Sequence, residues 1–334
     1  MKHFSAILVV FLLALASQPA LAQTIRRVNN SGITGTNIYT TLQAAHDAAS
    51  NGDIIQLEPS GVSAGTLTCT KNVRILGPGY FLVQNQPPAL QASTFSATTG
   101  TIIFNSGSSG AALSGLTVSG DVQINTSNIA VQRNNITGYV YIAYTNNALS
   151  NAVIRQNYIN AGIAYNTSPV VSNILVTNNI VIGLANLSPA GFSGEFSNNV
   201  VLGTVSLNNF TVQNNYIGST LTVTNNTSWT NNLLAQATLP TAGFSSNNTA
   251  GVAQSTVFVL APGSTAFDAW YKLKTGTNPA TGGGTGGTDI GAFGGSSGYG
   301  YRLSGIPSIP SIYQLDQQVN GNALNITIST RSNN

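Results

Sequence analysis

Residues 212–223 read Val-Gln-Asn-Asn-Tyr-Ile-Gly-Ser-Thr-Leu-Thr-Val, one copy of a pattern that runs through the middle of the chain. Residues 196–207 and 131–142 repeat it: an apolar residue, an asparagine three positions on, a second apolar residue, a small residue and an alternating apolar pair. This key asparagine recurs about every twenty residues, at Asn134, Asn157, Asn179, Asn199, Asn215, Asn232 and Asn247. In an earlier copy of the pattern, Leu116 occupies the same position. Such a period, with short alternating strands, indicates a solenoid.

Alternation within each short strand sends one set of side chains inward and the other to solvent. Stacked coils pair each strand with its copies above and below, about 4.8 Å apart. With short corners and no helical crossovers, the pattern predicts an all-β parallel β-helix. Asparagine tolerates the left-handed backbone of a sharp corner, and stacked amides can bond to one another as a ladder. Asparagine-rich disorder is the alternative, but the apolar positions keep their phase.

Core positions follow from the same phase. We expect Val140, Ile163, Val205 and Leu221 to point inward and Thr220 and Thr222 outward. A large residue occupies the slot three positions before the key asparagine in several copies, which predicts stacking in the core by Phe196, Trp229 and Phe244.

Composition is typical of one elongated domain that has few charges. Of 334 residues, 42% are hydrophobic and 6% charged, against about 25% charged in ordinary soluble domains. The net charge of +3 comes from scattered basic residues. Such a distribution does not predict a nucleic-acid partner.

Residues 1–22 are typical of a secretory signal. Lys2 precedes an apolar run, and Ala20-Leu21-Ala22 is a small-x-small cleavage site. The run is short for a membrane span, so we expect cleavage before Gln23, no span thereafter, and a secreted, periplasmic or cell-surface location. We expect Cys69, the only cysteine, to be a small buried residue.

Residues 41–50 predict a short helix, begun by Thr40 or Thr41 and ended by Asn51-Gly52. A β-helix has an open strand edge at each end, and such a helix would cover the first one. At the other end, residues 324–328 alternate again. We expect a C-terminal strand there that docks on the coils, pairs with a partner protein, or stays loose.

Several of these segments resemble a known superfamily. Residues 39–45, 51–57 and 73–77, followed by 263–268 and 288–293, resemble the start and the closing signature of pectin-lyase-like β-helix proteins. The resemblance implies a right-handed helix over about residues 36–294. It implies no single activity, because the superfamily includes lyases, hydrolases, adhesins and tail spikes. We therefore divide the chain into a signal peptide (1–22), an N-terminal cap and first coil (23–80), the parallel β-helix (81–294), and a proline-containing linker with a C-terminal strand (295–334).

The residues needed for catalysis are sparse. Glycoside hydrolysis ordinarily needs two carboxyl groups about 5–9.5 Å apart, and the phase places Asp121 and Glu195 on different sheets, several coils apart. The mature chain carries eight carboxylates: Asp47, Asp53, Glu58, Asp121, Glu195, Asp268, Asp289 and Asp316. Polysaccharide lyases of the superfamily that this chain resembles use a calcium-binding cluster of carboxylates. The sequence of the coils contains no such cluster. One cysteine and one mature histidine, His46, predict neither a zinc site nor a triad. We expect no cofactor, no metal and no catalytic residue.

Outward positions of one predicted sheet suggest a ligand-binding surface. Asp121 and Gln123 on one coil precede Tyr139 and Tyr141 on the next, and smaller residues follow. Carbohydrate-binding surfaces use aromatic side chains with polar neighbours. Strand propensity is the alternative explanation.

The sequence leaves two functions open. One is a secreted, non-catalytic β-helix with a structural, adhesive or glycan-binding role at a bacterial surface, whose partners are extracellular polysaccharide or another surface protein. The other is a diverged polysaccharide lyase or glycoside hydrolase. Turnover of acidic glycans would distinguish them.

Overall fold

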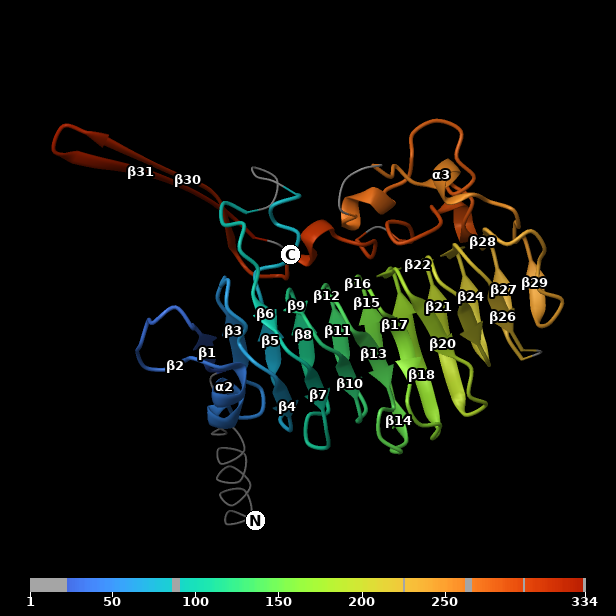
Figure 1. Ribbon diagram of the computed structural model, residues 1–334, viewed down its shortest axis with the longest axis horizontal. Coiled ribbons are helices and arrows are strands. Elements are labelled where there is room, and N and C mark those ends of the chain that lie inside the picture. The colour runs from blue at the N-terminus through green and yellow to red at the C-terminus, as the bar shows by residue number, and fades with distance from the viewer. Residues whose placement is uncertain (1–22, 86–90, 225, 262–265, 297, 333–334) are drawn as a thin grey trace, which may run out of the picture.

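The computed structural model describes residues 23–332 except 86–90, 225, 262–265 and 297. The residues interpreted as a signal peptide lie outside this range. The chain forms a parallel β-helix of about nine turns, which confirms the predicted fold class (Figure 1). The right-handed sense stays a prediction.

Three parallel sheets, here called A, B and C, run the length of the solenoid. Sheet A contains β1 (Ile25–Val28), β2 (Ile38–Tyr39), β3 (Ile54–Leu57), β5 (Arg74–Leu76), β8 (Ala112–Ser114), β11 (Ala130–Gln132), β14 (Leu149–Ser150), β15 (Val153–Arg155), β18 (Val171–Thr177), β21 (Phe192–Ser197), β24 (Phe210–Gln213), β27 (Ser228–Thr230) and β29 (Phe244–Ser246).

The other two sheets have eight strands each. Sheet B contains β4 (Leu67–Cys69), β7 (Ile102–Phe104), β10 (Val122–Ile124), β13 (Tyr139–Ile142), β17 (Gly162–Tyr165), β20 (Leu184–Leu187), β23 (Val205–Leu207) and β26 (Leu221–Val223). Sheet C contains β6 (Thr98–Thr99), β9 (Thr117–Val118), β12 (Asn135–Ile136), β16 (Tyr158–Ile159), β19 (Ile180–Val181), β22 (Val200–Val201), β25 (Tyr216–Ile217) and β28 (Leu233–Leu234).

The solenoid interior is apolar, and its phase is as expected. Val140, Ile163, Val205 and Leu221 are buried, whereas Thr220 and Thr222 are exposed. Helix α2 (Leu42–Ala48) covers the N-terminal end and inserts Leu42 and Ala45 into the core (Figure 1). The Thr41 hydroxyl caps it by accepting from the Ala44 amide. Cys69 is buried, and burial raises the pKa of its thiol to about 11.

A ladder of buried asparagine amides lines the corner between sheets A and C. The side-chain oxygen of Asn199 accepts from both the backbone N–H and the side-chain amide of Asn179, each at 3.0 Å. The Asn199 amide in turn donates to the Val176 carbonyl at 2.9 Å and to Asn215 at 3.0 Å. The same arrangement links Asn134, Asn157, Asn179, Asn199, Asn215 and Asn232, all fully buried.

The expectation for the ladder needs two corrections. Its last member is Asn248, which accepts from the Asn232 amides, whereas Asn247 is exposed. The left-handed backbone belongs to the residue before each ladder position, as at Asn198 (φ 53°) and Asn247 (φ 53°). The same one-residue shift explains Phe244, which is 72% exposed because Ser245, not Phe244, pairs with the buried Trp229.

The coils end earlier than residue 294. The last strand, β29, ends at Ser246, and residues 252–306, which we call the return segment, run back over the outer face of sheet C (Figure 1). This segment contains α3 (Gln254–Val257) and the short helices Asp268–Tyr271, Thr285–Gly287 and Leu303–Gly305. Its Phe258 ring packs on Tyr216 of sheet C, with centroids 4.9 Å apart. From β16 to β28, sheet C is therefore apolar on both faces.

The left-handed corner residues hold the return segment in place. The Asn178 amide donates to the carbonyls of Ala292 and Gly294, at 2.9 and 2.8 Å. Neighbouring corner residues do the same: the Arg133 guanidinium donates to the Ile306 carbonyl, and the Gln156 amide donates to the Gly300 carbonyl. In each of these coils the ladder asparagine bonds inward, and the residue before it bonds outward to the return segment.

The C-terminal strand lies where the sequence predicts it, but it pairs with a segment of the same chain that was not predicted to be a strand. Residues 324–328 lie in β31 (Ala323–Arg331), which pairs antiparallel with β30 (Ser311–Asn320) of the same chain. The two form a hairpin that projects from the N-terminal half of the solenoid (Figure 1). The proline-rich segment before it therefore does not lead to a single strand, as expected, but to the first strand of a hairpin.

Replacing Asn199 by alanine tests the ladder. Its loss would leave the buried Asn179 backbone N–H without its acceptor and would remove one bond each from the Asn179 side-chain amide, the Asn215 side-chain oxygen and the Val176 carbonyl. An unsatisfied buried group costs about 1–3 kcal/mol. We expect Asn199→Ala to lower the free energy of unfolding by about 2–4 kcal/mol, measured by denaturant titration. Thr222→Ala, on an exposed position of sheet B, is the control and should change it little. Equal effects would contradict a stabilising ladder.

Candidate functional site

The structure brings the four predicted surface residues together on the outer face of sheet B. Tyr141 of β13 is in register with Gln123 of β10, and Asp121 directly precedes β10. The Tyr139 backbone N–H donates to Asp121 Oδ1 at 2.8 Å. The Tyr139 and Tyr141 ring centroids lie 5.2 Å apart with planes tilted by 35°. All four residues are partly exposed.

Sequence reasoning missed a fifth member of this cluster. Tyr144 is 37% exposed and packs edge-on against Tyr141, with centroids 5.2 Å apart. Simple alternation along the strand fails here because Ala143 adopts a left-handed conformation (φ 57°) and turns the chain. The spacing Tyr-x-Tyr-x-x-Tyr was the available signal. We call Asp121, Gln123, Tyr139, Tyr141 and Tyr144 the tyrosine patch.

A glycine allows the Asp121 carboxylate to approach the next coil. A Cβ on Gly138 would lie 2.2 Å from Asp121 Oδ1 and 2.6 Å from the Gly120 carbonyl oxygen. No side chain fits at that distance, so only glycine permits the bond from Asp121 to the Tyr139 amide. The carboxylate is thereby fixed in orientation beside the rings.

The coil after the tyrosines places two small residues beside the rings. Gly162 pairs with Tyr139 and Ala164 with Tyr141, so two rings border two of the smallest side chains. Gly162 cannot be larger without strain, since a Cβ there would lie 2.3 Å from the Leu184 carbonyl oxygen. The residues beside the rings on this coil are therefore small, and Gly162 itself is buried.

Electrostatics keep the Tyr141 hydroxyl protonated. Its pKa is raised above the ordinary value, first by partial burial and then by the charges of Asp121 and the neighbouring phenols. At neutral pH the Tyr141 hydroxyl therefore both donates and accepts hydrogen bonds, beside the Gln123 amide and the Asp121 side chain.

A second hollow, also missed, lies between sheet A and the return segment. It has a volume of about 390 Å³. Its walls are polar, with Arg155, Glu195 and Gln213 from the coils and Thr288 and Tyr299 from the return segment. Gln213 Nε2 donates to Glu195 at 3.4 Å. The position of the return segment gave no signal in the sequence, so this groove could not be foreseen. Glu195 lies on sheet A and Asp121 beside sheet B, as expected.

Two other titratable side chains, Asp268 and His46, are buried and hydrogen-bonded within the fold. Asp268 is fully buried and accepts from the Ser304 N–H and the Asn85 amide, each at 2.7 Å; burial raises the pKa of its carboxyl. His46 is 2% exposed, and its Nε2 accepts from the Thr70 N–H at 3.1 Å. Within the described ranges, no group of three or more His, Cys, Asp or Glu residues is placed to hold a metal ion.

Over the part of the chain that the structure describes, no helix is both long enough and apolar enough to cross a membrane. Comparison of the chain with protein-family models, with curated proteins and with solved structures finds no match in any of the three.

A substitution at Gly138 tests the anchoring of Asp121. Gly138→Ala should push the carboxylate away from the Tyr139 amide, and the overpacking should cost about 1–3 kcal/mol. We expect a melting temperature several degrees lower. Gly61→Ala, where a Cβ meets open space, should leave it unchanged. A Gly138→Ala protein as stable as the wild type would show that this contact is loose.

Proposed function

We propose that the protein is a secreted, non-catalytic β-helix of the pectin-lyase-like kind that binds extracellular glycan through the tyrosine patch. One observation carries this proposal: two partly exposed tyrosine rings 5.2 Å apart lie beside a carboxylate held by a backbone amide and are paired with two small residues on the next coil. A partly exposed aromatic ring can pack against the apolar face of a sugar.

Polar groups around the rings would select the orientation of the sugar. The phenol hydroxyls can donate or accept, the Gln123 amide does both, and the Asp121 carboxylate accepts from sugar hydroxyls. Asp121 already accepts from the Tyr139 amide, so its position is fixed before a ligand arrives. Ordering costs on binding are correspondingly small.

The distribution of carboxylates supports binding without turnover. A hydrolase needs two carboxyl groups about 5–9.5 Å apart at the bond to be cleaved. Asp121 is the single carboxylate of the tyrosine patch, while Glu195 lies on another sheet. Residues 1–22, with their basic start, apolar run and Ala-Leu-Ala site, support export to the periplasm or the cell surface. There, a structural or adhesive role would follow from glycan binding.

A double substitution tests glycan binding. Tyr139→Ala with Tyr141→Ala should abolish binding on a glycan array and leave the melting temperature nearly unchanged, since partly exposed outward residues contribute little to stability. Thr204→Ala with Ser206→Ala, farther along the same sheet, is the matched control and should bind as the wild type does. Normal binding by the tyrosine variant would reduce the patch to strand propensity.

A second candidate function rests on the groove beside sheet A. Glu195 and Arg155 lie in one polar hollow of about 390 Å³, which suits a saccharide and brings an acid and a base into one site. Of the two catalytic alternatives, an acid beside a base favours a diverged polysaccharide lyase over a hydrolase, which would need a second carboxyl group. We would incubate the protein with pectins and alginates and follow unsaturated products and reducing ends. Turnover that Glu195→Gln abolishes would establish this function and contradict a purely binding role.

A further inference from the structure

The C-terminal hairpin has one apolar and one polar face. Cross-strand partners point to the same side of an antiparallel pair, and Leu315 pairs with Ile328, Gln317 with Ile326 and Val319 with Leu324. A bulge after Ile312 returns that residue to the same face, opposite Thr330. The other face is polar apart from Ala323 and contains Gln314, Asp316, Gln318, Asn320, Asn325, Thr327 and Ser329.

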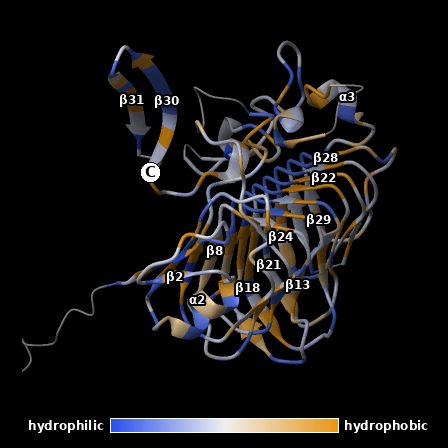
Figure 2. Cartoon of the chain, turned by 60° about the vertical axis from the view of Figure 1, so that its left-hand side comes forward, coloured by the Kyte–Doolittle hydropathy of each residue, from blue (hydrophilic) through white to orange (hydrophobic). Residues whose placement is uncertain are grey.

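The apolar face is open to solvent in the described structure. Its six large side chains are 44–78% exposed: Ile312, Leu315, Val319, Leu324, Ile326 and Ile328. Figures 1 and 2 both show the hairpin standing clear of the solenoid. A two-stranded hairpin in water is marginally stable at best. A regular hairpin of ten- and nine-residue strands with a continuous apolar face therefore indicates a surface that is covered in the working protein.

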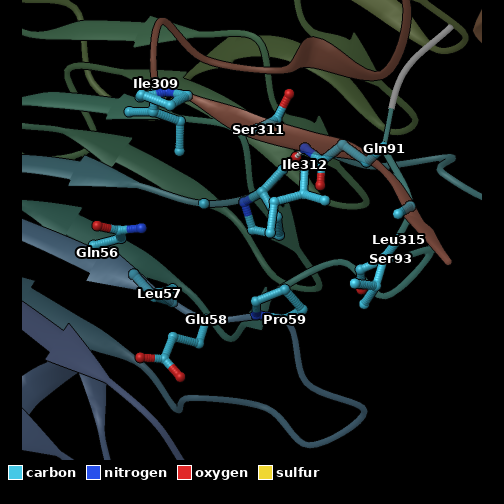
Figure 3. A pocket seen from close by; sticks show the side chains of 14 residues that line it. Gln56, Leu57, Glu58, Pro59, Gln91, Ser93, Ile309, Ser311, Ile312 and Leu315 are labelled. Carbon is cyan, nitrogen blue, oxygen red and sulfur yellow. Dashed lines mark hydrogen bonds between the residues drawn. The ribbon is translucent and has the colours of Figure 1, made fainter. Parts of the chain in front are cut away.

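The same face continues into a groove at the base of the hairpin. The groove has a volume of about 290 Å³, and hairpin residues Ile312 and Leu315 form one wall (Figure 3). Leu57 and Pro59 of the first coils and Ile309 of the linker complete its apolar lining. The hairpin thus presents protruding side chains at its tip, Val319 and Leu324, and a hollow at its base.

We propose that a second copy of this chain covers the hairpin, with the two apolar faces packed together in opposite directions about a two-fold axis. Opposed directions place the tip of each hairpin at the groove of the other, so one surface serves both partners, as two-fold symmetry requires. Packed faces lie about 10 Å apart, which lets the aliphatic side chains interdigitate.

The area of the face matches a weak, specific dimer. The six side chains expose on the order of 500 Å² of apolar surface, at the upper range for a monomer. Two copies would bury about 1,000 Å², near the lower limit of specific interfaces. With groove contacts added, this area is consistent with a dissociation constant on the order of micromolar.

Gln317 favours a protein occupant over a lipid surface. It is the one large polar side chain in the apolar face, between Leu315 and Val319. In a lipid phase its amide would be costly without a partner. At the centre of a two-fold interface, the two Gln317 amides meet and can bond to each other, since each both donates and accepts.

Sedimentation velocity of the chain from Gln23 onward, over a range of concentrations, measures self-association. We expect a monomer–dimer equilibrium that Val319→Asp with Ile326→Asp weakens at least tenfold. Gln318→Asp with Asn325→Asp places charges on the same strands but on the opposite face, and should dimerise as the wild type does. A wild-type protein that remains monomeric, or equal effects of both variants, would overturn the proposal. Sedimentation of a monomeric protein with lipid vesicles would overturn it in favour of a membrane.

Cross-linking tests the arrangement even if charged variants disturb the hairpin. Cys69 is buried and its thiol pKa is about 11, so an introduced cysteine would be the one reactive thiol at neutral pH. Gln317→Cys, near the two-fold axis, should give covalent dimers with a short bismaleimide, and Gln318→Cys should not. Cross-linking at both or at neither would contradict face-to-face packing.

Discussion

The corner between sheets A and C depends on a single repeated interaction, the bond from one buried asparagine amide to the next. A turn inside a solenoid leaves backbone groups with no strand partner, and burial without partners is costly. Each ladder asparagine satisfies its own coil and its neighbour, as Asn199 does for Asn179 and Val176. The coils can then stack with their ladder asparagines buried, and the strands of sheet A follow one another in unbroken order from β8 to β27.

The return segment is arranged around that corner. From β16 onward, each short strand of sheet C directs one apolar side chain outward, such as Tyr158 and Tyr216. The return segment covers them, and the amides of the left-handed corner residues attach it. This leaves sheet B free to present its outer face, where the tyrosine patch lies, and creates the polar groove beside sheet A.

The sequence predicted what the repeat determines and little beyond it. Fold class, inward phase and the clustering of Asp121 with Tyr139 all follow from period and alternation. The end of the ladder was displaced by one residue because Asn247-Asn248 contains two asparagines, and only three-dimensional pairing identifies the buried one. The return segment could not be derived, since residues 252–306 carry no period and their position depends on distant contacts with residues such as Asn178.

The return segment also sets the number of coils. Successive corners bond to successively earlier points along it: Arg133 to Ile306, Gln156 to Gly300, Asn178 to Ala292 and Asn198 to Asp289. A repeat protein normally lengthens by duplicating one unit, because each unit contacts only its neighbours. Here an inserted coil would shift every later corner by about 4.8 Å against a segment of fixed length. Growth by duplication of a coil would therefore require a matching insertion in the return segment, between residues 252 and 306.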